Sequence, residues 1–324
     1  MADMTLEMSR MQWFRERGLK WVLAPGALVI LYLFFGAFGR SYFSYPTLVN
    51  IIDAAYYIGF ISMGVTFVII SGGIDLSIGT VMMCAAITGG TALKAGLPMV
   101  PSLLLIVVVG LAFGFLNGIM VSRLRMPPFI VTLGTFNIAY ALVRIYTTAT
   151  VTNVPPALLF FGNTFKIGST EITYGTVVML ILFIIGWYVL RSTPAGRSIY
   201  AVGDNPEAAR LAGIHTSRVL TAVYTVAALS YGVAGLLLVG RTGVGDPNAG
   251  QNGNLDSITA VVLGGTSLLG GRGDMMGTLV GALIVGVFRN GLQLMGVGSI
   301  FQVLITGILV ILAVSVDYLS HRGK

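Results

Sequence analysis

Long apolar stretches without charge recur along the sequence of 324 residues, and they constrain its fold more than any other feature. A helix needs about 20 apolar residues to cross a bilayer, because only a helix or a closed barrel satisfies its backbone polar groups there. These stretches predict an all-α polytopic membrane protein with about ten transmembrane helices, some of them broken. The predicted spans are roughly residues 20–38, 54–70, 78–93, 99–121, 127–147, 173–190, 219–240, 257–269, 276–297 and 300–319.

The composition excludes most soluble classes of protein. The chain is 56% hydrophobic and only 10% charged, whereas a soluble domain carries about 25% charged residues. A single cysteine, Cys84, cannot form an intrachain disulfide, and two histidines, His215 and His321, cannot build a conventional zinc site. Neither histidine lies in a predicted span, which argues against an intramembrane hydrolase.

The basic residues predict the orientation. If the N-terminus is cytoplasmic, 13 of the 19 Lys and Arg residues fall on the cytoplasmic side, as the positive-inside rule requires. The net charge of +7 therefore needs no nucleic-acid partner. Arg144 and Arg289 fall within spans but near their ends, where a long side chain can snorkel to the interface. The expected organisation is a cytoplasmic leader 1–19, a transmembrane domain 20–319 and a cytoplasmic tail 320–324, the first span being an uncleaved signal anchor rather than a cleaved signal peptide.

Two glycine-rich segments, 71–77 and 264–273, interrupt apolar helix. Irregular backbone at membrane depth survives only where protein or a water-filled cavity satisfies it. Their separation by five spans suggests an inverted repeat of spans two to five and seven to ten. The sequences of residues 114–118 and 74–78 roughly resemble those of 286–291 and 255–258, although chance also explains each similarity.

The cytoplasmic loop 191–218 is predicted to contain a short helix. Asp204 or Asn205 can cap it, Pro206 suits its first position, Glu207 complements the positive end of the dipole, and Gly213 can end it in a left-handed conformation. An isolated helix of two turns is marginal in water, so a partner protein is implied.

This loop carries a resemblance to a known family. Glu207-Ala208-Ala209 followed by Gly213 resembles the Glu-Ala-Ala-x-x-x-Gly element of bacterial ABC importer permeases, whose loop seats a coupling helix in the ATPase subunit. Together with segments 71–77 and 263–273, it resembles the permeases of the ribose, xylose and galactose branch of sugar importers, over about residues 50–317. Leu269 stands where that family often has Ser. The coupling residues implied by the resemblance are Gly203, Asp204, Asn205, Pro206, Glu207, Ala208, Ala209 and Gly213.

The resemblance implies the permease subunit of an ATP-driven, binding-protein-dependent importer of a monosaccharide, in the bacterial inner membrane. The only Gly-Lys pair is Gly323-Lys324, so the chain has no phosphate-binding loop of its own. ATP and Mg would bind to a partner ATPase, and this chain would hold no cofactor, metal or catalytic residue. A periplasmic sugar-binding protein would contact the outer segments 153–171 and 241–256, although a flexible connector also explains the latter. A second permease copy would complete the transporter.

Four polar residues are candidates for the transport pathway: Asp75, Ser77, Asn117 and Asn290. A carboxylate at membrane depth is costly and marks function by default, although Asp75 could instead cap the next helix. The asparagines could line a path for a hydroxyl-rich solute or hydrogen-bond between helices. The glycines of 264–273 are expected to permit close packing or a turn rather than to touch the substrate.

A secondary transporter driven by an ion gradient is the alternative function. Such a carrier usually shows several intramembrane carboxylates or histidines, and the sequence offers essentially Asp75. The solute stays open among pentoses, hexoses, sugar alcohols and furanoses, with nucleosides and branched amino acids less favoured. Homodimer and heterodimer are equally compatible with the sequence.

Overall fold

A computed structural model describes residues 23–38, 42–147, 149–152, 154–168, 170–250 and 253–321. The predicted leader 1–19 and the last residues of the predicted tail, 322–324, lie outside the described residues. Each of the ten predicted spans contains a helix. The helices are Leu23–Phe38, α2 (Tyr45–Ala54), α3 (Tyr56–Ile70), α4 (Ile78–Lys94), α5 (Met99–Ser122), α6 (Pro128–Tyr146), α7 (Pro156–Leu159), α8 (Tyr174–Ser192), α9 (Pro194–Asp204), α10 (Pro206–Leu211), α11 (Thr216–Thr242), α12 (Gly253–Leu263), α13 (Met275–Leu294) and α14 (Ser299–His321).

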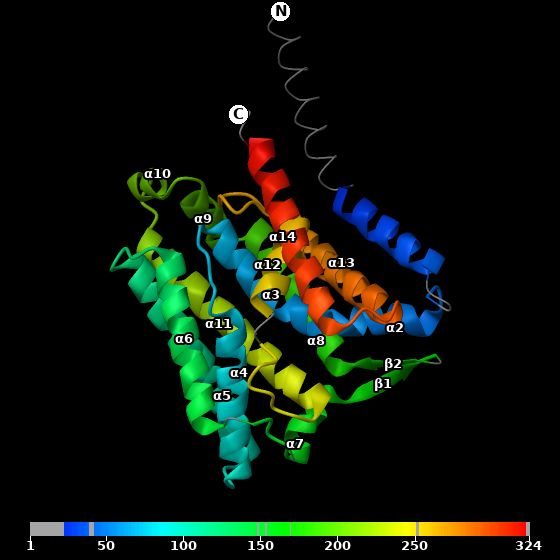
Figure 1. The fold of residues 1–324 in the computed structure, drawn as a ribbon. Coiled ribbons are helices and arrows are strands. Elements are labelled where there is room, and N and C mark those ends of the chain that lie inside the picture. The colour runs from blue at the N-terminus through cyan, green and yellow to red at the C-terminus, as the bar shows by residue number, and fades with distance from the viewer. Residues whose placement is uncertain are drawn as a thin grey trace, which may run out of the picture.

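The bundle is organised around α3 and α11. Every residue of α3 except Tyr57 is buried, and α11 packs against α3, α4 and α5 (Figure 1). Small residues allow the closest of these contacts: a Cβ added to Gly114 of α5 would lie 2.5 Å from the carbonyl oxygen of Tyr224. Glycine lets two helix backbones meet there, as in many membrane bundles.

The polytopic prediction is confirmed in its coarser form. Five helices, α5, α6, α8, α11 and α13, are by themselves long and apolar enough to cross a membrane. The bent pair of α2 and α3, with a 41° angle between its halves, would make a sixth. Leu23–Phe38, α4, α12 and the first part of α14 are apolar but shorter, so the count of ten spans stays a prediction.

The all-α prediction is wrong at one place. Strands β1 (Thr164–Ile167) and β2 (Thr170–Thr173) form an antiparallel hairpin with Thr164 opposite Thr173. The Thr, Ile and Phe residues of these segments suit a strand, but four-residue strands give a weak signal beside spans of about twenty residues. The hairpin and α7 lie at the opposite end of the molecule from α10 and the end of α14 (Figure 1).

The two glycine-rich breaks meet at one end of the bundle. The N–H of Gly271 donates to the carbonyl oxygen of Ile70 at 2.9 Å. The two predicted breaks therefore lie together in the fold, and the inverted repeat itself stays a prediction.

Two carboxylates are buried against arginines. Asp53, at the end of α2, accepts from Arg241 and from the Thr173 hydroxyl (2.7 Å). Asp256 of α12 is 1% exposed and pairs with Arg289 of α13. The predicted snorkelling of Arg289 is wrong, because the side chain turns inward to this carboxylate.

We expect Arg289→Met to lower the free energy of unfolding by about 3–5 kcal/mol, because it leaves the Asp256 carboxylate buried without its cation. Thermal unfolding in detergent measures the change. Adding Asp256→Asn should restore most of the loss, since the buried charge is then gone. Arg191→Met is the control, because Arg191 is exposed and stacks on Trp187, and it should change stability by at most about 0.5 kcal/mol. An unchanged Arg289→Met protein would contradict the account.

Candidate functional site

The break between α3 and α4 carries a buried polar cluster. Gly72 has a φ of 80°, which turns the chain away from α3. Asp75 Oδ1 then accepts from the Ser77 N–H at 2.8 Å and from the Ser77 hydroxyl at 2.6 Å. Both predicted uses of Asp75 remain compatible with this geometry, since the carboxylate organises the start of α4 and is buried inside the bundle.

Asn117 of α5 completes the cluster. Its side-chain N–H donates to the Ser77 hydroxyl at 3.2 Å, and its Oδ1 makes no hydrogen bond to any described residue. Asp75, Ser77 and Asn117 are 2%, 1% and 1% exposed, so the cluster is closed to solvent. The buried Tyr231 of α11 lies within electrostatic reach of the carboxylate and was missed, because a tyrosine in an apolar span gives no signal of its own.

Asn290, the fourth predicted pathway residue, does not join this cluster. It lies on α13, which packs mainly against α12 and α3. Its Oδ1 is buried and makes no hydrogen bond to any described residue. Its neighbour Arg289 makes the ion pair with Asp256 and donates to the Tyr57 hydroxyl at 2.8 Å. The structure thus has one polar cluster between α4 and α5 and another between α12 and α13.

The N-termini of α4 and α12 meet beside the first cluster. Asn254 accepts from the Gly79 N–H at 2.8 Å and donates to the carbonyl oxygen of Leu76 at 2.6 Å. Gly79 and Gly250 approach reciprocally: a Cβ added to either would lie within 2.0 Å of the other's carbonyl oxygen. A flexible connector is therefore the wrong interpretation for the end of segment 241–256. Asn254 was missed, although an Asn just before an apolar run is typical of a helix start.

The loop 191–218 contains two helices, α9 and α10, where the sequence predicted one. Asn205, not Asp204, is the cap of α10: its Oδ1 accepts from the N–H groups of Glu207 (3.1 Å) and Ala208 (2.9 Å). Pro206 begins the helix, and Gly213 follows it with a φ of 87°. The predicted start and stop of this helix are confirmed. Asp204 instead ends α9.

One face of α10 is open. Ala209 is 5% exposed and packs inward, whereas Glu207, Ala208 and Arg210 are exposed. The Arg210 Nε donates to Glu207 at 3.2 Å, and this bond lowers the pKa of the Glu207 carboxyl. Glu207 therefore stays charged at neutral pH.

Four glycines join this loop to the broken helix, and we call them the glycine junction: Gly72, Gly203, Gly270 and Gly271. A Cβ added to Gly203, near the end of α9, would lie 1.8 Å from the carbonyl oxygen of Ile70. One added to Gly270 would lie 2.7 Å from the carbonyl oxygen of Gly203. The glycines of 264–273 permit close packing or a turn, as expected, and Gly265 is a case of the turn, with a φ of 87° and nothing within 4 Å of an added Cβ. The backbone of α9 lies directly against the chain five residues before Asp75.

The chain matches one protein family over most of its length. A profile of the family described as "Branched-chain amino acid transport system / permease component" matches residues 47–314. Among solved structures, none matches the chain significantly.

Curated relatives are import permeases. The chain is 43% identical to the fructose import permease protein of Rhizobium meliloti, covering 90% of this chain and 83% of that protein. It is 37% identical to the ribose import permease protein of Bacillus subtilis, covering 90% of each. It is 32% identical to the galactose/methyl galactoside import permease protein of Haemophilus influenzae, covering 86% of this chain and 90% of that protein.

Replacing Ser77 tests the first polar cluster. Ser77→Ala removes the hydroxyl that donates to Asp75 and accepts from Asn117, so we expect the free energy of unfolding to fall by about 1–3 kcal/mol. Thermal unfolding in detergent measures this. Ser198→Ala serves as the control, because its hydroxyl bonds only within α9 at the surface, and it should cost at most about 0.5 kcal/mol. Equal stability of the two variants would contradict the role of Ser77.

Proposed function

This chain belongs to the family of branched-chain amino acid transport system / permease components, and we propose that it is the permease subunit of an ATP-driven importer that receives a monosaccharide from a binding protein. The family match covers residues 47–314. Relatives named for the import of fructose, ribose and galactose support a sugar as the solute. The resemblance found in the sequence is confirmed at the level of the family.

We infer ten membrane crossings in an inner membrane, with both termini cytoplasmic. The distribution of Lys and Arg supports this orientation. The common location of α10 and the end of α14 at one end of the bundle is consistent with it (Figure 1). The reciprocal approach of Gly79 and Gly250 supports an inverted repeat, in which α4 and α12 are the corresponding short helices whose N-termini meet.

The observation that carries the proposal is the glycine junction. An ATPase subunit that binds α10 would move α9 with it, because Asn205 connects the two helices directly. Gly203 contacts the Ile70 carbonyl group backbone to backbone, so no flexible side chain intervenes. Displacement of α9 would therefore reach the break that holds Asp75. The proposed coupling residues are the eight predicted from the sequence, 203–209 and Gly213.

Asp75, Ser77 and Asn117 are the proposed pathway residues. They offer a carboxylate, a hydroxyl and an amide, which can exchange their mutual hydrogen bonds for those of a hydroxylated solute when the path opens. Asn290 would act at a separate point along α13. The covalent chemistry belongs to the partner, where ATP and Mg bind, and a second permease copy, identical or similar, would complete the path.

The alternative function, a carrier driven by an ion gradient, is not supported by the two further buried carboxylates that the structure contains. Asp53 and Asp256 are buried, which the sequence did not indicate. Each is paired with an arginine and is thus poorly suited to cyclic protonation. The capped and exposed α10 would also have no role in such a carrier.

Co-purification in detergent tests the partner. We expect the tagged wild-type chain to recover an ABC ATPase subunit, and Glu207→Ala and Gly213→Arg to recover at least about tenfold less. Gly213→Arg should act by straining the left-handed turn that ends α10. Absence of an ATPase with the wild-type chain, where a known importer recovers its own, would overturn the proposed function.

Gly203→Ala tests coupling apart from docking. The added methyl group must displace the Ile70 backbone, so we expect the ATPase still to bind while ATP-dependent sugar uptake in proteoliposomes falls about tenfold or more. Gly134→Ala in α6 is the matched control, since nothing lies within 4 Å of its added Cβ, and its uptake should equal that of wild type. Normal uptake by Gly203→Ala would remove the glycine junction from the coupling mechanism.

A further inference from the structure

The turn between α5 and α6 has an unusual backbone. Arg125 has a φ of 53°, and it is the one non-glycine residue with positive φ in the described part of the chain. Glycine usually occupies such a left-handed position just after a helix, because a side chain costs about 1 kcal/mol there. Keeping an arginine where glycine would relax the backbone points to a use for its side chain.

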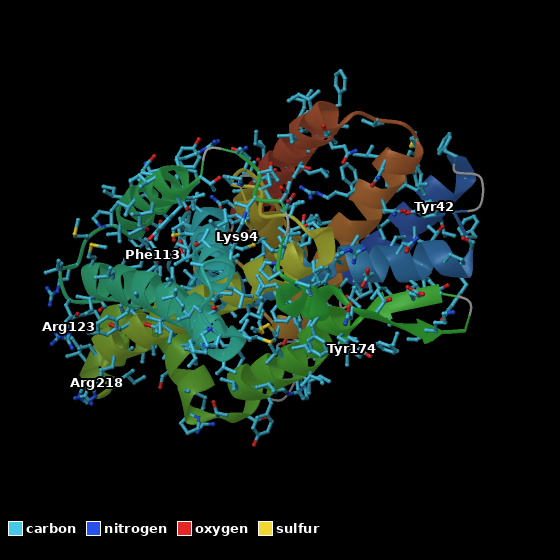
Figure 2. The ribbon with its side chains drawn as sticks, turned by 90° about the horizontal axis from the view of Figure 1, so that it is seen from below. Tyr42, Lys94, Phe113, Arg123, Tyr174 and Arg218 are labelled. Atoms are coloured by element: carbon cyan, nitrogen blue, oxygen red, sulfur yellow. The ribbon has the colours of Figure 1, made fainter. Side chains whose placement is uncertain are left out.

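This turn is fixed to the first turns of α11, the helix that follows α10 along the chain. Ser122 is the last residue of α5. Its hydroxyl oxygen lies 2.9 Å from the Thr221 hydroxyl of α11 and accepts a hydrogen bond from the Ser217 hydroxyl at 3.2 Å. Only residues 212–215 separate α10 from α11, and Figure 2 labels Arg123 and Arg218 at the same edge of the molecule. Arg210 lowers the pKa of the Glu207 carboxyl most, and the positive charge of Arg125 adds to that lowering.

Apolar side chains stand exposed on this surface. Leu124 is 64% exposed in the turn, and Leu211 is 76% exposed at the end of α10. Both belong to polar connecting segments rather than to the spans that face lipid. The exposed arginines around them are Arg123, Arg125, Arg210 and Arg218, against the single acid Glu207. We call these seven residues the turn–α10 face.

We propose that the turn–α10 face, and not α10 alone, is the docking surface for the ATPase subunit. Leu124 and Leu211 enter an apolar groove of that subunit, and Arg125 meets a carboxylate at its rim. An apolar centre with a charged rim is the usual anatomy of a protein interface, and the excess of arginine selects an acidic partner. This inference rests on the proposed function.

A second point of attachment also has a mechanical reason. A six-residue helix such as α10 is only about 9 Å long, and a single short contact lets the partner rotate about it. Contact with the turn as well fixes the partner's orientation. Movement of the ATPase is then delivered to α9 rather than lost as rotation.

The test replaces Arg125 with glycine. Relief of the left-handed strain offsets the added flexibility of the unfolded chain, so the midpoint of thermal unfolding should stay within about 2 °C of wild type. The affinity for the ABC ATPase subunit recovered with the wild-type chain should nevertheless fall about tenfold, and that of Leu124→Ala similarly. Arg191→Ala removes an exposed arginine at the end of α8, which is not one of the seven residues of this face, and should bind as wild type.

Three outcomes overturn the inference. Wild-type affinity in Arg125→Gly and Leu124→Ala, while Gly213→Arg loses the ATPase, would restrict docking to α10 and leave the proposed function standing. Titration in nanodiscs of phosphatidylcholine alone addresses the other occupant, an anionic lipid headgroup. If the effect of Arg125→Gly appears only with phosphatidylglycerol present, lipid rather than the ATPase contacts Arg125. Failure of the wild-type chain to bind any ATPase would remove both proposals.

Discussion

The hydrogen bond from the Gly271 N–H to the Ile70 carbonyl oxygen, 2.9 Å long, is the contact on which the rest of the structure depends. A helix that stops inside an apolar bundle leaves carbonyl groups without partners, and each must be satisfied by protein. Here a loop 201 residues further along the chain supplies the donor. That demand draws α9 and the segment 264–273 to the end of α3, and only glycines allow three backbones to meet there. The same break turns Asp75 into the interior.

Much of this arrangement could be predicted from the sequence, because apolar length and helix-capping residues act locally. The ten apolar stretches each contain a helix, and Asn205, Pro206 and Gly213 bound α10 as expected. What could not be predicted depends on partners distant in sequence. The position of Arg289 near a span end predicts snorkelling, because the sequence does not show that Asp256 lies opposite it in the fold. Likewise, the polar segment around Asn254 gives no sign that this side chain bonds to Leu76 and Gly79.

Polar groups in the bundle fall into two kinds with different consequences. Asp53 and Asp256 each form an ion pair with an arginine of another helix, so these pairs hold the helices together. Asp75 is held by neutral donors from Ser77, and Asn117 retains an unused acceptor. The hydroxyl groups of a solute can replace the Ser77 donors, whereas they cannot replace the arginine of a buried ion pair without leaving its carboxylate uncompensated. A path for a neutral, hydroxylated solute is therefore expected along the second kind of group.

The distance in sequence between Ile70 and Gly271 also delays the formation of their hydrogen bond during synthesis of the chain. At synthesis rates of about 5–20 residues per second, roughly 10–40 s pass before the ribosome has made the donor that the end of α3 requires. During that time the first spans are already inserted, with exposed carbonyl groups and an unshielded Asp75. Nascent chains of this protein should therefore stay close to the insertion machinery, and truncation just before residue 271 should leave a product that quality-control proteases recognise.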